Sequence, residues 1–376
     1  MKSKLRICVI VPVLGAQNSI LYVFSELKKI GCNIIVITST SGGYKSKSKN
    51  SPFEIIDGLE IHRIADQISS KSFLKEIESV KLILDKTKPN VVLFGTWGLF
   101  KIGYKISRLY DAKLIWLTEF YFNERRFIGG RKYYLGLKFL IKPVAFVLRN
   151  YFSKNVDRII LSDISEKKYI SETSKKLVSV GWCNNLPSNY NADRIPLNLK
   201  LNQAIFAGSL ITITINDNFV KAVSYLLNNS VVEKVIVIGD GPQRPVIDEL
   251  IYQYGSDKIV YLGQMDRIDV LDLIKKSKLA LNTTYEGGWG FIGECFALGT
   301  LLLYTRNHYL FNHKKDSYLL KFDQNNLQEL ISLIENESCY ATLQEYMIQR
   351  FHHEHSAKAI AGKYYNLMYT TVDRNE

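Results

Sequence analysis

Two glutamates eight residues apart, Glu286 and Glu294, flank a segment with four glycines in seven residues, Gly287, Gly288, Gly290 and Gly293. Glycine lets the backbone adopt positive φ and lets a ligand approach the main chain closely. An apolar run at 279–281 predicts a short buried strand before the segment, and residues 294–298 predict the start of a helix after it. A glycine loop that opens onto a helix N-terminus presents free N–H groups, so it favours an anion.

Two ionised carboxylates beside an anion site would repel the anion unless they face something else. A carboxylate can accept two hydrogen bonds from a vicinal diol. The segment therefore predicts a ligand that has both phosphate and hydroxyl-rich parts, such as a nucleotide-sugar. The alternative is a plain strand-to-helix turn, in which the glycines serve packing and Glu294 only caps the helix. The spacing alone favours neither interpretation.

The rest of the chain alternates strand and helix patterns. At 376 residues, two domains are the expected arrangement. Apolar runs predict strands at 5–13, 33–38, 91–94, 113–117, 158–162, 177–180, 203–210, 235–238 and 259–263. Amphipathic spacing predicts helices at 19–30, 73–86, 165–174, 219–227, 245–254 and 270–276, and Asp57-Gly58 predicts a hairpin turn. This alternation indicates an α/β fold with parallel sheets that helices cover on both faces.

Composition argues against several classes of protein. No run has the length and purity of a membrane-spanning helix, and the first residues lack the apolar region and cleavage site of a signal peptide. The five cysteines are scattered and odd in number, which indicates reduced core thiols in a cytoplasmic protein. No cysteine pair has metal-ligand spacing, and the histidines at 352–355 have no matching carboxylate cluster, so we expect no metal.

The positive charge is concentrated in one part of the chain. The first 200 residues contain 33 lysines and arginines against 16 acidic residues, and the remainder contains 16 against 20. We expect the basic part to meet a membrane surface, a lipid-linked diphosphate or nucleic acid, the alternative being a basic surface that only aids solubility. Zinc-finger, ribonucleoprotein and recognition-helix patterns are absent from the sequence, so nucleic acid is not expected.

Residues 123–157 interleave cations with aromatic and apolar side chains. This pattern suits a helix that lies in a membrane interface, kinked at Pro143. The alternative is an ordinary amphipathic helix on the domain surface. The cations that would face an anionic membrane are Arg125, Arg126, Arg131, Lys132, Lys138 and Lys142.

The Glu286-x7-Glu294 pair with its glycines resembles the donor-site signature of retaining family-four glycosyltransferases (glycosyl transferases group 1). Three further motifs occur in the family's order and approximate spacing: Gly208-Ser209, Gly239-Asp240-Gly241-Pro242 and Gly263-Gln264-Met265. The resemblance implies the GT-B architecture, in which two Rossmann-like domains have parallel sheets that face a central cleft. Residues 1–190 would form the acceptor domain, 191–355 the nucleotide-sugar donor domain, and 356–376 a helix that crosses back to the first domain.

The resemblance also implies roles for single residues. Glu294 would bind the ribose hydroxyls of the donor, Glu286 would hold the hydroxyls of the transferred sugar at the catalytic centre, and Met265 would offer main-chain contacts to the base. Transfer would be a same-face substitution that needs leaving-group stabilisation rather than a protein nucleophile or a metal. Gly15 fits the family's glycine turn on the acceptor side. The other donor-binding positions would be Gly208, Ser209, Gly239, Gly241, Arg244, Gly287, Gly288, Trp289 and Gly290.

The chain departs from the family pattern at two places. Where the family usually has Arg and Lys on the donor diphosphate, this sequence has Ser209 and Thr214. Losing two charge-assisted contacts would cost about 1.5–3 kcal/mol each if nothing replaced them. The candidate replacements are Arg244, Lys221, Arg267 and Arg306.

The second departure concerns the first domain. The family commonly supplies a histidine at the end of the strand predicted at 113–117, and this chain has Thr118-Glu119 there. Glu119 is therefore a candidate catalytic residue, because ligands bind at the carboxyl ends of parallel strands. The alternative is a solvated carboxylate, or one paired with Arg125 or Arg126.

We expect a retaining glycosyltransferase of hexosyltransferase type, cytoplasmic and peripheral on the inner face of the membrane. It would move a sugar from a nucleotide-sugar to a glycan or lipid-linked acceptor in surface polysaccharide, lipopolysaccharide or glycolipid biosynthesis. One alternative is a degenerate relative that binds nucleotide-sugar or anionic lipid without efficient transfer. Another is a sugar-nucleotide epimerase of the same architecture, but the additional catalytic acids and cleft histidine of such enzymes are not evident in the sequence.

Overall fold

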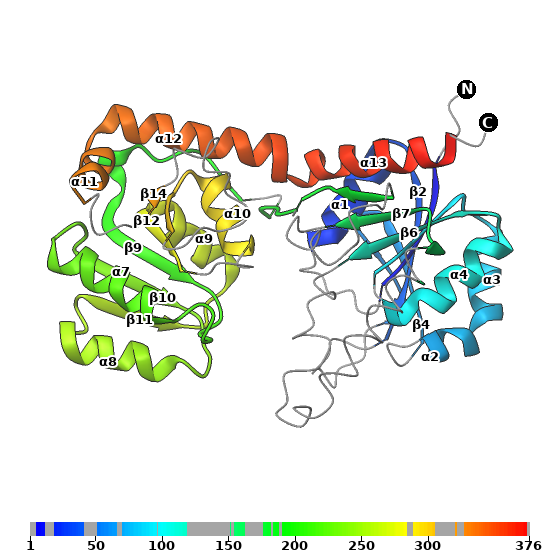
Figure 1. Cartoon of the computed structure of the whole chain (residues 1–376), viewed down its shortest axis with the longest axis horizontal. Coiled ribbons are helices and arrows are strands. Elements are labelled where there is room, and N and C mark those ends of the chain that lie inside the picture. The colour runs from blue at the N-terminus through cyan, green and yellow to red at the C-terminus, as the bar shows by residue number, and fades with distance from the viewer. Residues whose placement is uncertain are drawn as a thin grey trace. The chain divides into compact units, whose positions relative to one another are not determined.

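The computed structural model describes residues 5–11, 19–40, 51–65, 70–95, 97–118, 151, 154–161, 176–181, 183–187, 190–283, 289–304, 320–321 and 327–373. The chain divides into two compact units (Figure 1). The first unit contains residues 1–183 and 357–376, and the second contains residues 184–356.

An eight-stranded sheet forms the centre of the first unit, in the order β3-β4-β2-β1-β5-β6-β7-β8. All neighbouring strands are parallel except the edge pair β3 and β4. The strands are β1 (Arg6–Ile10), β2 (Asn33–Ser39), β3 (Phe53–Ile56), β4 (Leu59–Ala65), β5 (Val91–Phe94), β6 (Lys113–Thr118), β7 (Arg158–Leu161) and β8 (Leu177–Ser179). The predicted hairpin is confirmed, because Asp57 and Gly58 join β3 to β4 with positive φ values of 49° and 78°.

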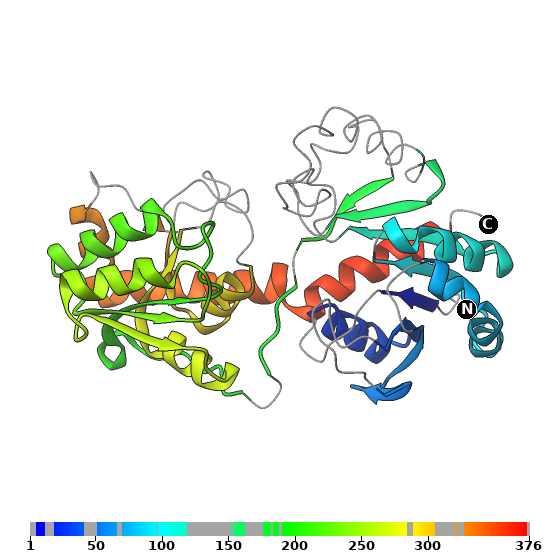
Figure 2. The same cartoon turned by 90° about the horizontal axis from the view of Figure 1, so that it is seen from below.

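Helices cover both faces of this sheet. They are α1 (Ser19–Lys29), α2 (Ser70–Lys75), α3 (Ile77–Asp85), α4 (Phe100–Leu109) and α13 (Ala357–Asp373). Figure 2 shows α13, in red, beside α1, in blue, and one apolar cluster joins the two helices to the sheet through Phe24, Leu27, Tyr364 and Met368. The C-terminal helix therefore completes the core of the first unit.

The helix predicted over 73–86 is two helices in the structure. Its backbone breaks at Glu76, whose φ of −97° and ψ of 20° lie outside the helical region. The N–H of Glu76 donates to the carbonyl of Phe73, three residues back, at 3.2 Å, so the turn there is tighter than an α-helix. Phe73 before the break and Val80 after it are both fully buried against the same face of the sheet.

The second unit contains a six-stranded parallel sheet in the order β11-β10-β9-β12-β13-β14. Its strands are β9 (Leu201–Ala207), β10 (Lys234–Ile238), β11 (Ile259–Gly263), β12 (Ser277–Asn282), β13 (Leu301–Tyr304) and β14 (Leu320–Lys321). Its helices are α7 (Asp217–Asn228), α8 (Arg244–Tyr254), α9 (Arg267–Lys276), α10 (Trp289–Leu298), α11 (Leu327–Glu335) and α12 (Glu337–Arg350). The predicted α/β class with two parallel-sheet units is confirmed.

Strand order decides which helices share a face of this second sheet. The chain steps from β9 through β10 to β11 in one direction, and from β12 to β13 in the other. Because crossover connections between parallel strands are right-handed, α7 and α8 lie on one face and α9 and α10 lie on the other. The packing of α9 against α10 agrees with this arrangement. All the strands end at one edge of the sheet, and that edge holds the loops considered below.

All five cysteines are free, with Cys8, Cys32 and Cys295 buried and Cys339 exposed. None of the helices in the described part of the chain combines the length and the apolar character that crossing a membrane requires.

Lys200 is a buried lysine just before β9. Lys200 is only 6 % exposed. Its Nζ donates to the carbonyls of Lys275 and Ser277 at 2.9 and 3.2 Å and to Oγ1 of Thr300 at 3.4 Å. Burial lowers the pKa of Lys200 to about 7 from its ordinary value of 10.5, because the charged form loses its hydration.

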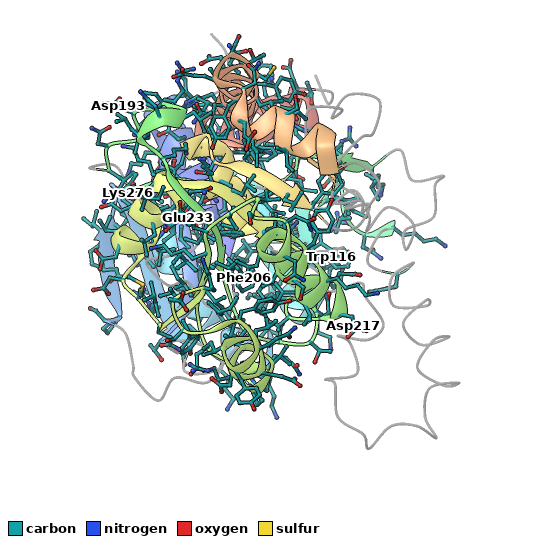
Figure 3. All side chains as sticks on the ribbon, turned by 90° about the vertical axis from the view of Figure 1, so that its left-hand side faces the viewer. Trp116, Asp193, Phe206, Asp217, Glu233 and Lys276 are labelled. Carbon is teal, nitrogen blue, oxygen red and sulfur yellow. The ribbon has the colours of Figure 1, made fainter. Side chains whose placement is uncertain are left out.

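This burial predicts an unusual dependence of stability on pH. Between pH 7 and 10.5 the unfolded chain holds a proton on Lys200 that the folded chain lacks, so the free energy of unfolding rises with pH by up to about 1.4 kcal/mol per pH unit. We expect Lys200→Met to remove this contribution, which urea unfolding at pH 7, 8 and 9 would measure. The exposed Lys276 (Figure 3) gives the control Lys276→Met, which should follow wild type. Parallel pH profiles for wild type and Lys200→Met would contradict the prediction.

Candidate functional site

The loops after β9, β10 and β11 are joined to one another by backbone hydrogen bonds. The N–H of Gly208 donates to the carbonyl of Ile238 at 3.0 Å, and the N–H of Gly239 donates to the carbonyl of Gly263 at 2.7 Å. The N–H of Leu210 donates to the carbonyl of Asp240 at 3.0 Å. The three glycine motifs found in the sequence therefore form one connected surface at the carboxyl edge of the sheet, where ligands of α/β folds bind.

Two of these glycines are required by the geometry. Gly239 and Gly241 have φ values of 123° and 154°, which side-chain-bearing residues rarely adopt. A Cβ on Gly239 would lie 1.9 Å from the carbonyl oxygen of Gly208, and one on Gly241 would lie 2.4 Å from that of Leu210. The β10 loop thus packs directly on the main chain of the β9 loop, and only glycine permits this approach.

Thr214, which stands where the family usually has a lysine, serves the structure of its own loop. Its Oγ1 accepts from the N–H of Ile211 at 3.1 Å and lies within hydrogen-bond distance of the Ser209 and Ile211 carbonyls. The carbonyl of Thr214 in turn accepts from Oγ1 of Thr283, at the end of β12. Ser209 is exposed at the tip of this loop.

The helix that carries Glu294 begins earlier than the sequence predicts. α10 starts at Trp289, so Glu294 is its sixth residue and lies in the second turn. The prediction that residue 294 is at the start of the helix is therefore wrong, and Gly290 and Gly293 are helical residues rather than loop residues. Gly293 permits a close contact, because a Cβ there would lie 2.5 Å from Nδ2 of Asn184. Asn184 uses the same Nδ2 to donate to the carbonyl of Gly290 at 2.6 Å.

Glu294 forms an ion pair with Arg267, the first residue of α9. Nε and Nη2 of Arg267 lie 3.1 and 3.0 Å from Oε1 of Glu294, and Nη2 also donates to the carbonyl of Asn185 at 2.7 Å. The Glu294 side chain is only 14 % exposed. Burial raises the pKa of Glu294, and the guanidinium of Arg267 partly opposes that rise. Among the described residues, no group donates a hydrogen bond to Oε2.

The other cations proposed from the sequence have different surroundings. The guanidinium of Arg244 is paired with Asp248, with Nη2 2.6 Å from Oδ1, and its Cζ lies 3.3 Å from the centroid of the Tyr261 ring. Lys221 is exposed on α7 and lines a hollow of about 650 Å³ between the first turns of α7 and α8. Asp217 in Figure 3 marks the α7 end of this hollow. Met265 is half-buried in the loop that leads from β11 to Arg267.

Several predicted site residues lie outside the described residues, so their interpretation stays a prediction. They are Gly15, Glu119, Glu286, Gly287, Gly288, Arg306 and the six cations Arg125, Arg126, Arg131, Lys132, Lys138 and Lys142. Trp289 is described only as a helical residue, without its side chain. No cluster of three metal-ligating side chains occurs in the part of the chain that the structure describes.

The partner of Glu294 is the functional feature that sequence reasoning missed. The sequence suggests Arg267 only as a diphosphate cation, and nothing in the spacing of residues 267 and 294 indicates their contact. Asn184, which holds the first turn of α10, falls in residues 184–201, whose Asn-, Pro- and Ser-rich composition indicates only a linker between the domains.

No known protein-family model matches the chain, and no curated protein sequence matches it. Solved structures, in contrast, are similar over almost the whole chain. Sucrose-phosphate synthase from Thermosynechococcus elongatus superposes with a TM-score of 0.68 at 13 % identity, covering 99 % of this chain and 100 % of that chain. Anabaena HepE in complex with UDP and glucose superposes with a TM-score of 0.61 at 13 % identity, covering 96 % of this chain and 98 % of that chain. WaaG, a glycosyltransferase involved in lipopolysaccharide biosynthesis, superposes with a TM-score of 0.58 at 14 % identity, covering 96 % of this chain and 99 % of that chain.

These similarities show that the chain has the GT-B fold. The resemblance to group 1 glycosyltransferases inferred from the glycine and glutamate motifs is confirmed at the level of the fold.

Proposed function

We propose that this chain is a glycosyltransferase that takes a sugar from a nucleotide-sugar. The observation that carries the proposal is Glu294, a largely buried carboxylate in the donor-site motif, held through Oε1 by Arg267. The second carboxylate oxygen, Oε2, accepts no hydrogen bond from the described residues, and we propose that it accepts from a hydroxyl donor such as a ribose. Arg267 directly follows the loop that contains Met265, so the carboxylate lies beside the loop expected to meet the base. HepE, which has a similar fold, is known in complex with UDP.

The proposed chemistry is transfer with retention of configuration, by substitution on one face of the sugar. Such a reaction needs stabilisation of the departing diphosphate more than a protein nucleophile. Arg244 and Arg267 already have carboxylate partners, so we propose that the main-chain N–H of the exposed Ser209 and the N-terminal turn of α10 meet much of that charge. Glu286 would hold the hydroxyls of the sugar, and no metal would be needed.

The proposed acceptor is a glycan or a lipid-linked glycan at the inner face of a membrane. The excess of lysine and arginine in the first 200 residues supports an anionic partner for the first unit. WaaG provides an example of a similar fold in lipopolysaccharide biosynthesis. Transfer of a hexose, a role in surface polysaccharide or glycolipid assembly, and peripheral attachment through residues 123–157 belong to this proposal.

Binding and turnover of wild-type protein test the proposal in sequence. Isothermal titration with UDP, GDP, ADP, CMP and dTDP should give saturable binding for one base, and the matching nucleotide-sugars should then be screened for transfer to membrane extracts by release of the nucleotide. Binding of one nucleotide together with release of that nucleotide from its sugar supports a transferase. A folded protein that binds none of them would overturn the proposal.

A degenerate binder is the second candidate, and one observation favours it. The two family cations are replaced by Ser209, which is neutral, and by Thr214, whose hydroxyl is used within its loop. This candidate predicts nucleotide binding without nucleotide release from any nucleotide-sugar, in the presence or absence of acceptor extract. The same experiment therefore separates the two functions.

A further inference from the structure

We infer that Arg267 is a positioning residue of the donor site: it fixes Glu294 through Oε1 and thereby presents Oε2 to the cis-diol of a nucleotide ribose. This inference rests on the proposed function, because it concerns how the donor-site carboxylate is held. Arg267 belongs to α9 and Glu294 to α10, so the contact joins two helices that pack on the same face of the second sheet.

The geometry separates this role from that of a diphosphate cation. Nε and Nη2 both reach Oε1 of Glu294, and Nη2 also donates to the Asn185 carbonyl at 2.7 Å. A guanidinium has five N–H donors in a rigid plane, so these three contacts fix the orientation of the whole group. A guanidinium fixed in this way orients the carboxylate it binds. Both of its contacts to Glu294 go to Oε1, and within the described part of the chain Oε2 has no donor, so it can serve a ligand.

The main chain of α10 is fixed independently, at the first turn. Asn184 donates from Nδ2 to the Gly290 carbonyl at 2.6 Å and lies against Gly293, where a Cβ would have no room. Asn184 is itself held, because its N–H donates to the carbonyl of His355 at 3.0 Å. Asn184 therefore anchors the backbone of α10. Its neighbour Asn185 holds Arg267, and Arg267 in turn holds the Glu294 side chain.

The charges near Glu294 give this role a measurable signature. Arg267 on α9 and Cys295 on α10 are the titratable groups that interact with Glu294 in the described part of the chain, and Lys200 interacts with Cys295 from the segment before β9. Arg267 opposes the rise in the pKa of Glu294 that burial causes. Without Arg267, the pKa of Glu294 rises further, so the group stays protonated up to a higher pH. The protonated group has lost its negative charge, and its hydrogen bonds to hydroxyl donors are therefore weaker.

The experiment measures the affinity of the nucleoside diphosphate that wild type prefers, by titration calorimetry between pH 6 and 9. Wild type, Arg267→Met, Arg267→Lys and the double variant Arg267→Met with Glu294→Gln are compared. Thermal unfolding of each variant shows whether it is folded. The double variant carries no titratable carboxyl at position 294, so it is the matched control for any new pH dependence.

The inference predicts that Arg267→Met binds about tenfold or more weakly than wild type at pH 6 and recovers affinity as pH rises, since protonation of Glu294 removes a hydrogen bond to a charged acceptor. Arg267→Lys should retain part of the wild-type profile, and the double variant should lack the new pH dependence. Uniform weakening at every pH, or wild-type affinity in Arg267→Met, would overturn the inference and leave the proposed function intact. Absence of nucleotide binding in folded wild type would overturn both.

Discussion

Gly239→Ala is expected to destabilise the second unit more than any other single glycine substitution at the candidate site. The φ of 123° is strained for alanine by about 1–3 kcal/mol. The new Cβ would also lie 1.9 Å from the carbonyl oxygen of Gly208, and moving that main chain adds about 1–3 kcal/mol. The displaced Gly208 carries part of the proposed donor surface, so nucleotide affinity should fall together with the free energy of unfolding. Urea unfolding and nucleotide titration measure the two effects.

Two control substitutions separate strain from collision. Gly31 has a φ of 96°, and no atom lies within 4 Å of the position that a Cβ would take. The loss of stability in Gly31→Ala therefore measures the cost of positive φ alone. Gly362→Ala lies within α13, also with open space around its Cβ, and should stabilise the chain by about 0.5–1 kcal/mol. If Gly239→Ala cost no more than Gly31→Ala, the close packing of the β9 and β10 loops would be contradicted.

Most strands of the two sheets could be predicted because they are apolar on both faces, although β13 and β14 were not predicted. Runs such as residues 235–238 become strands buried between two helix layers, and β10 matches that prediction to within one residue. The hairpin at Asp57-Gly58 was equally predictable, since both residue types tolerate positive φ. The order of motifs along the chain then indicated which strand ends would form the donor edge.

The start of α10 could not be predicted in the same way. Glycine lowers helix propensity, so Gly290 and Gly293 favour a loop when only local sequence is considered. In the structure both are helical, and Gly293 is needed because Asn184, over a hundred residues earlier, packs against it. The pairing of Arg267 with Glu294 likewise depends on which helices share a face of the sheet. Such contacts follow from tertiary structure and leave no periodic signal in the sequence.

Glu294→Gln is expected to lower nucleotide affinity by about tenfold to a hundredfold. The reason is that a hydrogen bond to a charged acceptor contributes about 1.5–3 kcal/mol, and the substitution removes that charge. The substitution keeps the shape of the side chain and leaves the Asn185 carbonyl bonded to Arg267. Turnover should fall at least as much, if the ribose contact helps to align the donor. Glu345→Gln is the matched control, since Glu345 lies on α12 in the same unit and is half-exposed at 54 % near Arg194. It should retain wild-type affinity.

A ligand that lacks the ribose diol turns this comparison into a test of the contact itself. Wild type should bind the 2′,3′-dideoxy form of its preferred nucleoside diphosphate much more weakly than the natural form, because Oε2 of Glu294 then has no hydroxyl partner. Glu294→Gln should discriminate far less between the two ligands, since both changes remove the same interaction and their effects are not additive. Equal discrimination by wild type and Glu294→Gln would mean that the carboxylate does not meet the ribose. The buried pair of Glu294 and Arg267 would then be structural, and the diol would be bound by another residue of the donor edge.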